Sequence, residues 1–109
     1  MRRLLFISFV IISTVLTSCG SKTPLTESQK VYAGKWVTND GTWLQIYNNG
    51  GGDFKQSNSN VTGGSATITD KTITIGLFGI NSEYTIDTPP YQENDIWYME
   101  LDGNVYQKQ

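Results

Sequence analysis

The feature that most constrains this chain is a succession of short segments in which apolar and polar residues alternate. Beyond Gly34 these segments are rich in Thr, Ile, Val, Tyr and Trp, and clusters of Gly, Asn and Asp separate them. A period of two residues is typical of a half-buried β-strand, and no segment beyond Gly34 has the period of a helix. We predict eight strands, at Lys35 to Thr38, Thr42 to Asn48, Asp53 to Ser57, Gly64 to Thr69, Thr72 to Gly79, Glu83 to Asp87, Ile96 to Leu101 and Asn104 to Lys108.

The links between these segments are short and suit tight hairpins. Asn, Asp and Gly tolerate the positive φ that such turns need, and they occupy Asn39-Asp40-Gly41, Asn48-Asn49-Gly50, Asp70-Lys71 and Asp102-Gly103-Asn104. Short links make neighbouring strands antiparallel. We therefore predict an all-β fold, a small antiparallel up-and-down β-barrel, with a barrel-like sandwich as the alternative. Strands this short leave little interior space, so we expect side chains to fill the barrel.

Each predicted strand has one apolar face. Ile73, Ile75 and Leu77 share a face, and Thr72 and Thr74 lie on the other. The same pattern pairs Ala66 with Ile68, Tyr84 with Ile86, and Trp97 with Met99 and Leu101. One face of the sheet should therefore be buried and the other solvated.

A short helical turn precedes the first strand. Thr26 and Gln29 have the spacing of a capping box, which predicts a turn running to Ala33 and ending at Gly34. The Gly34-Lys35-Trp36 sequence that follows is similar to the G-x-W signature of lipocalins. That resemblance implies a lipocalin-like barrel in which Trp36 plugs one end. The domain is shorter than a lipocalin, and the arginine that packs on the signature tryptophan is absent, with Lys108 nearby.

Further segments extend this pattern: Asp40-Gly41, Leu44-Gln45-Ile46, Gly63-Gly64-Ser65, Ile75 to Ile80 and Trp97 to Tyr106. Together they span most of Gly34 to Lys108 and resemble small lipocalin-like bacterial lipoproteins.

The N-terminus has the pattern of a secretory signal peptide. Arg2 and Arg3 precede an apolar run from Leu4 to Leu16, and small residues lead to Cys19. The run is too short to cross a bilayer, which takes about 20 residues. Leu16-Thr17-Ser18-Cys19 resembles the bacterial lipobox. The resemblance implies cleavage before Cys19 and attachment of this cysteine to diacylglycerol; an ordinary signal peptide or a short membrane helix are the alternatives.

These features divide the chain into a signal peptide at 1–18, a lipidated tether at 19–26 and a barrel domain at 27–109. No Asp follows Cys19, and in Gram-negative lipoproteins this usually directs the product to the outer membrane. We expect a protein of the bacterial cell envelope, anchored by lipid in the outer membrane and facing the periplasm.

Composition limits what the remaining 91 residues can bind. Without Arg2 and Arg3, six lysines stand against ten acids, so the side chains carry a net charge of −4. An acidic chain without arginine is poorly suited to bind nucleic acid, because proteins bind nucleic acid through clusters of Lys and Arg. The single cysteine is the one assigned to lipid, so no disulfide is expected within the domain.

The sequence contains few residues of the types that usually carry out catalysis or bind metal ions. There is no histidine, so zinc and copper sites and the usual general base are not expected. Most acids fall in turns or at strand ends, where solvent surrounds them; they are Asp40, Asp53, Asp70, Asp87, Glu93, Asp95 and Asp102. Glu100 alternates with Met99 and Leu101 and should face outward. We therefore expect that the protein is not an enzyme and that it binds neither a metal ion nor a cofactor.

Four aromatic residues are candidate ligand contacts: Trp43, Tyr47, Phe78 and Trp97. Trp43 and Tyr47 share one face of their strand with Gln45, opposite Leu44 and Ile46. If they point outward they form a binding stripe; we favour the inward orientation, in which they belong to the core.

Four further segments have functional and structural interpretations. Ile75 to Ile80, which contains Phe78, is either a bent core strand or an exposed apolar rim. Pro89 to Asn94 is the longest predicted loop, and Asn60-Val61-Thr62 matches the glycosylation sequon but is most simply a polar loop. Asn48 to Asp53 is a hairpin turn rather than a cation loop, because it lacks the ligand pattern of an EF-hand.

Our leading functional hypothesis is a non-enzymatic lipoprotein that binds a small apolar ligand or an envelope component. The alternative is a protein-binding lipoprotein, such as an inhibitor or an immunity protein against a toxic enzyme. A purely structural envelope protein is a third hypothesis.

Overall fold

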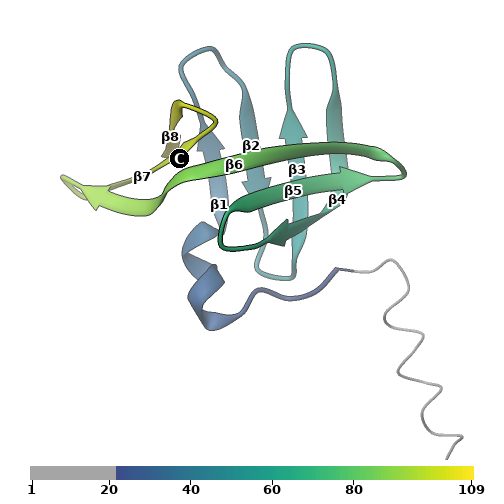
Figure 1. Cartoon of the computed structure of the whole chain (residues 1–109), viewed down its shortest axis with the longest axis horizontal. Helices are drawn as coiled ribbons and strands as arrows, with labels where there is room; N and C mark the ends of the chain where they lie inside the picture. Colours follow the sequence, from purple (N-terminus) through teal and green to yellow (C-terminus); the bar gives the residue numbers. More distant parts are fainter. Residues whose placement is uncertain (1–21) are drawn as a thin grey trace, which may run out of the picture.

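Eight antiparallel strands close into a β-barrel in the computed structural model, which describes residues 22–109 (Figure 1). The strands are β1 (Gly34–Val37), β2 (Trp43–Ile46), β3 (Gly51–Lys55), β4 (Asn60–Ile68), β5 (Thr72–Leu77), β6 (Ile80–Glu93), β7 (Ile96–Leu101) and β8 (Asn104–Lys108). Each strand pairs with the next, and β8 closes the barrel on β1 through Trp36 opposite Lys108. The all-β, up-and-down barrel is thus confirmed over the sandwich. The predicted signal peptide at 1–18 and the predicted lipidation site Cys19 lie outside the described residues.

Two predicted loops are strands. Pro89 to Asn94, expected to be the longest loop, is largely the second half of β6, and Asn60-Val61-Thr62 opens β4. The pairing of β6 with β7 shifts between Thr88 and Tyr91. A proline has no N–H to donate, and such irregular places in a ladder are where strands tolerate it. The turn preceding β4 closes through the Gln56 N–H, which donates to the Ser59 carbonyl oxygen at 2.8 Å.

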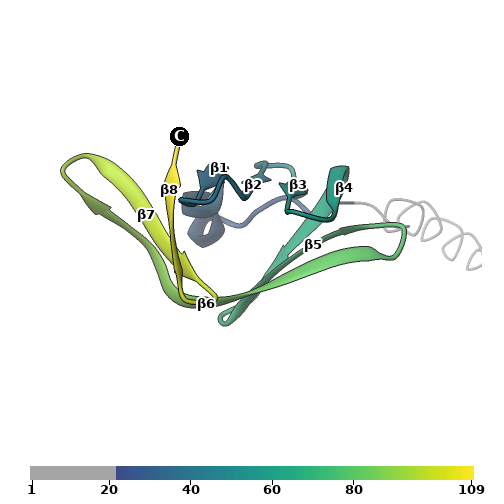
Figure 2. The same cartoon turned by 90° about the horizontal axis from the view of Figure 1, so that it is seen from above.

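β6 is also longer than predicted and links two hairpins. Seen from above, it runs from the β5–β6 turn to the β6–β7 turn, at opposite ends of the molecule (Figure 2). Phe78 and Gly79 form the first turn, and Asn94 and Asp95 form the second, with positive φ at all four residues. The side chains of Phe78, Asn94 and Asp95 are exposed at these two turns.

The interior of the barrel is filled by side chains from the apolar faces. The largest fully buried side chains are Trp36, Phe54, Leu44, Ile46, Ile73, Ile75, Met99 and Leu101. Ala66 and Tyr84, predicted on the apolar face, are buried, whereas the adjacent Thr67 and Glu83 are exposed. The alternation predicted from the sequence is confirmed on these strands, and burial of this apolar surface is the main stabilising term.

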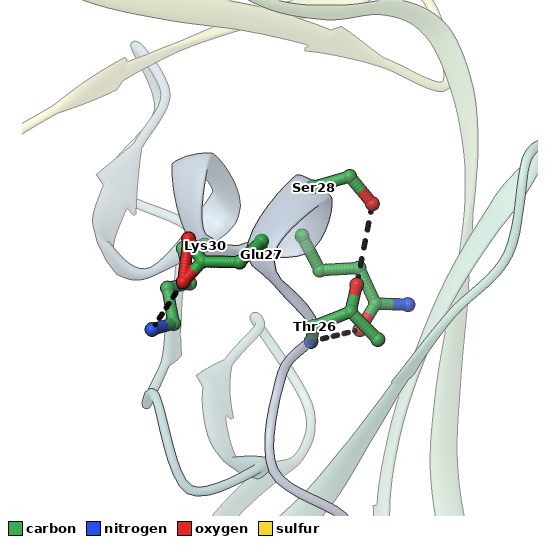
Figure 3. A network of polar contacts seen from close by, with 5 residues as sticks. Thr26, Glu27, Ser28 and Lys30 are labelled. Carbon is green, nitrogen blue, oxygen red and sulfur yellow. Dashed lines mark hydrogen bonds and ion pairs between the residues drawn. The ribbon is translucent and has the colours of Figure 1, made fainter.

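A short 3-10 helix, η1 (Glu27–Tyr32), lies at one end of the barrel. Its first turn is capped by Gln29, whose Oε1 accepts the Thr26 N–H at 3.0 Å, and the Lys30 and Glu27 side chains pair at 3.0 Å (Figure 3). Trp36 packs beneath the helix, and its Nε1–H donates to the carbonyl oxygen of Tyr32 at 2.9 Å. The capping pattern therefore produces a helical turn, as predicted, in 3-10 form.

The segment before η1, residues 22–25, packs on the barrel and is called the strap below. Leu25 is 8% exposed and belongs to the hydrophobic core, and its N–H donates to the Asn48 carbonyl oxygen at 2.9 Å. Thr23 lies so close to Gly50 that a Cβ on this glycine would overlap the Thr23 carbonyl group. Figure 1 shows the strap passing along the β2–β3 turn. Leu25, which lies in the stretch predicted to be a lipidated tether, is thus a core residue.

None of the helices in the described part of the chain is long and apolar enough to span a membrane.

Candidate functional site

The candidate site lies on the outer face of β2, because Trp43 and Tyr47 point away from the core. Leu44 and Ile46 are 0% and 1% exposed, whereas Tyr47 is 39% exposed and Trp43 is half-buried. The inward orientation that we favoured for the two aromatic side chains is wrong. Alternate residues of a strand lie on opposite faces, so burial of Leu44 and Ile46 directs Trp43 and Tyr47 outward.

Trp43 is covered by a lysine from the neighbouring strand β1. The Nζ of Lys35 lies 4.4 Å from the centroid of the Trp43 ring, which is a cation–π distance. Lys35 pairs in register with Gln45, the residue between Trp43 and Tyr47. This contact leaves Tyr47 as the more accessible of the two aromatic rings.

Beside Tyr47 the surface is hollowed into a groove of about 300 Å³, called the glycine groove below. It lies over β3 and β4 and the strap, and it is lined by Lys22, Tyr47, Asn49, Gly51, Gly52, Asp53, Thr62, Gly63 and Gly64. Four of these residues lack a side chain, so the backbone itself forms much of the floor. Small-molecule sites of proteins begin at about this volume.

The two adjacent glycines Gly51 and Gly52 face opposite sides of the sheet. A Cβ on Gly51 would meet Asn49, Lys22 and Tyr47 side-chain atoms at 3.1 to 3.3 Å, so it points into the groove. A Cβ on Gly52 would meet Ala66 and Ile75 at 3.0 and 3.1 Å, so it points into the core. The first glycine keeps the groove open, and the second gives the core residues room.

A bulge between β3 and β4 supplies the polar centre of the groove. Gly52 pairs with Gly64 and Phe54 with Val61, so Asp53 alone faces two residues of β4. One of the two is Gly63, with a φ of 83° that favours glycine.

Asp53 is 8% exposed and holds this bulge through both carboxylate oxygens. Oδ1 accepts the N–H of Gly63 at 2.7 Å, and Oδ2 accepts the hydroxyl of Tyr47 at 2.6 Å. The expectation that solvent surrounds Asp53 is therefore wrong. A carboxylate offers about four acceptor positions, so these two bonds leave it with acceptor capacity toward the groove.

The hydrogen bond to Asp53 also affects the chemistry of Tyr47. This bond is the main reason that the pKa of the Tyr47 phenol is raised above its ordinary value. The phenol is therefore a neutral donor at neutral pH, and the carboxylate is its acceptor.

The other two predicted ligand contacts lie elsewhere. Phe78, at the β5–β6 turn, is 93% exposed. Trp97 is half-buried against the core, with Lys108 Nζ 5.5 Å from its ring. The fold thus brings Trp43 and Tyr47 onto one face, and it does not gather the four aromatic residues into one site.

Glu100 is half-buried, and its carboxylate accepts the hydroxyl of Tyr91 at 3.3 Å. Burial and the nearby Glu100 carboxylate raise the pKa of Tyr91. Within residues 22–109, no group of three or more His, Cys, Asp or Glu side chains is placed to hold a metal ion.

The comparisons give no relative from which a role could be transferred. No family model, no curated protein and no solved structure matches this chain.

Proposed function

We propose that the chain is a non-enzymatic lipoprotein of the bacterial cell envelope that binds an envelope component through the glycine groove. The observation that carries the proposal is the groove itself: an open hollow with a half-exposed tyrosine and a buried carboxylate. Aromatic walls with a few convergent polar groups are typical of binding sites.

The outer surface is favoured over the barrel interior because the interior is occupied. Eight large side chains, from Trp36 through Leu101, are fully buried there, and none of them lines the glycine groove. A ligand inside the barrel would have to displace close-packed core atoms, which costs folding free energy. We therefore place recognition on the outer face, unlike the interior site that a lipocalin-like barrel implies.

The anchor would place the groove close to the membrane. Three residue steps separate Cys19 from Lys22, and extended chain covers at most about 3.6 Å per residue, so the lipid would lie within about 11 Å of the strap. Two or more acyl chains on Cys19 would hold the protein stably, since each buried methylene contributes about 0.8 kcal/mol.

Fractionation tests the anchor. The Cys19→Ser variant should appear in the soluble periplasmic fraction, and the unaltered protein should stay with the outer membrane. Retention of the variant in the membrane would contradict lipid anchoring.

Site-specific cross-linking tests the binding face. A photoreactive phenylalanine analogue at Tyr47 should yield an adduct with an envelope component in intact cells. The same group at Val105, which is 49% exposed on β8, is the matched control and should give none. Adducts of equal yield at both positions, or none at Tyr47, would count against the groove.

A protein partner is the second candidate function, and the β5–β6 turn favours it. Phe78 and Ile80 are 93% and 52% exposed there, and exposed apolar side chains often mark contacts with proteins. If this turn binds a partner, Phe78→Ser should abolish the complex in a cross-linking pull-down and leave the fold intact. An unchanged complex would exclude the turn.

A further inference from the structure

We propose that the ligand of the glycine groove is a saccharide, bound with a sugar ring against Tyr47 and its hydroxyls toward Asp53. The inference rests on the proposed function, because it assigns a ligand class to the same groove. The proposal is based on the charges of the groove, on its apolar surface and on its hydrogen-bonding groups.

Charge balance selects a neutral ligand. Of the residues that line the groove, Lys22 carries a positive charge and Asp53 a negative one. An anion would meet the buried carboxylate, and a cation would meet the lysine. The groove as a whole is therefore matched to a ligand without net charge.

The buried carboxylate excludes a purely apolar ligand. Covering Asp53 with hydrocarbon would remove its remaining contact with water and leave acceptor positions without donors, which costs free energy. The ligand must therefore present hydroxyl or amide donors at this point. This argument replaces the small apolar ligand predicted from the sequence by one that is amphipathic.

The remaining surface is apolar and flat on one side. The ring of Tyr47 forms a wall, and Gly51, Gly63 and Gly64 line the groove with backbone in place of side chains. A pyranose ring has an apolar face of C–H groups and an edge of hydroxyls, so it can stack on the tyrosine while its hydroxyls reach the carboxylate.

Two side chains at the rim can complete the hydrogen bonding. Asn49 uses its Oδ1 to accept the Gly51 N–H at 2.9 Å, which orients its NH₂ group as a donor. Lys22 supplies an ammonium donor from the strap. Sugar hydroxyls both donate and accept, so one ring can satisfy Asp53, Asn49 and Lys22 together.

Calorimetric titration tests the ligand class. Full-length lipoprotein, in a detergent without a sugar headgroup, is titrated with triacetylchitotriose and with maltotriose. Binding of either sugar is expected, and Tyr47→Ala should weaken it at least tenfold. Tyr91→Ala, which removes another tyrosine hydrogen-bonded to a carboxylate, should leave it within twofold.

Amide spectra of the unaltered protein provide a measurement that no folding defect can obscure. The sugar should shift the N–H signals of Gly51, Gly63 and Gly64 and leave that of Gly103, in the β7–β8 turn, unchanged. Binding of neither sugar, shifts elsewhere only, or binding that survives Tyr47→Ala overturns the saccharide proposal.

Two further experiments distinguish a cell-wall glycan from a free oligosaccharide, and a failure of the saccharide proposal from a failure of the proposed function. Sedimentation with purified cell-wall sacculi, competed by the soluble trisaccharide, distinguishes a wall glycan from a free oligosaccharide. If neither sugar binds and the Tyr47 cross-link still forms, the saccharide proposal fails and the proposed function stands. If the cross-link also fails, both are contradicted.

Discussion

The Nζ of Lys108 lies 5.0 Å from the centroid of the Trp36 ring. The lysine comes from the last strand and the tryptophan from the first, so the contact lies where β8 closes on β1. Lys108 also donates to the Val31 carbonyl oxygen at 3.2 Å, and burial lowers its pKa. This lysine thus links the first strand, the last strand and the 3-10 helix at the seam of the barrel.

Removing this lysine should weaken the closure of the barrel. Lys108→Ala loses a cation–π contact and a hydrogen bond to backbone, and we expect a loss of about 1 to 2 kcal/mol of unfolding free energy. Lys108→Arg should retain most of it. Urea titration of the three proteins provides the comparison, and an alanine variant as stable as the unaltered chain would show that the contact adds nothing.

Trp36 should contribute more than any aromatic residue of the outer face. Its side chain is 0% exposed, so Trp36→Ala leaves a cavity and should cost about 3 to 5 kcal/mol. Trp43→Ala, on the outer face of β2, is the control and should cost less than half as much. The melting temperatures of the two variants, measured under the same conditions, test this difference. Equal decreases in melting temperature would contradict the role of Trp36 as the plug.

Two glycines with the same backbone angle isolate the contribution of the strap. Gly41 and Gly50 both have a φ of 89°, but a Cβ on Gly41 meets nothing within 4 Å, whereas one on Gly50 overlaps Thr23. Gly41→Ala should cost about 1 to 2 kcal/mol from backbone strain alone. Gly50→Ala should cost about 1 to 3 kcal/mol more, because the strap must move.

Limited proteolysis provides the second readout for this pair. The strap should be cut faster in Gly50→Ala than in Gly41→Ala. Equal stabilities and equal cleavage rates would mean that the strap is not held by this contact.

Alkaline pH should destabilise the barrel through Tyr106. Burial raises the pKa of its phenol to about 12, from the ordinary value of 10.0 for tyrosine. Because the folded state keeps this proton and the unfolded state loses it, stability is full below pH 10 and falls as the pH rises toward 12. The loss amounts to roughly 2 to 3 kcal/mol.

Urea midpoints at pH 9 and pH 11.5 measure this loss. Tyr106→Phe has no proton to lose and should show a smaller decrease over the same interval. A decrease as large as that of the unaltered chain would assign the effect to other groups, among them Tyr84, whose pKa is also raised by burial.

The predictable parts of the fold are those with strong local sequence patterns. β7 and β8 begin and end where predicted, because the alternation of apolar and polar residues on each strand is interrupted only by the Asp102-Gly103 turn. The second half of β6 was missed because Pro89 and Pro90 argue locally against a strand. Only the shift in pairing with β7, which is a tertiary feature, makes them compatible with the ladder.

The candidate site was predictable only in part for a related reason. Periodicity placed Trp43 and Tyr47 on one face and Leu44 and Ile46 on the other. Both faces carry large hydrophobic side chains, so the pattern did not reveal which face is inside. The role of Asp53 depends on the bulge opposite it, and the register between two strands determines a bulge. The adjacent glycines on both strands, Gly51-Gly52 and Gly63-Gly64, were the available sequence signal.

The most direct test of binding at the outer face compares Gly51→Val with Gly52→Ala in the Tyr47 cross-linking assay. The two neighbours point to opposite sides of the sheet, one into the groove and one into the core. We expect Gly51→Val to remain folded and lose the adduct, and Gly52→Ala to be less stable yet retain the adduct below its melting temperature. An adduct that survives Gly51→Val and disappears in folded Gly52→Ala would place the ligand inside the barrel and contradict the account.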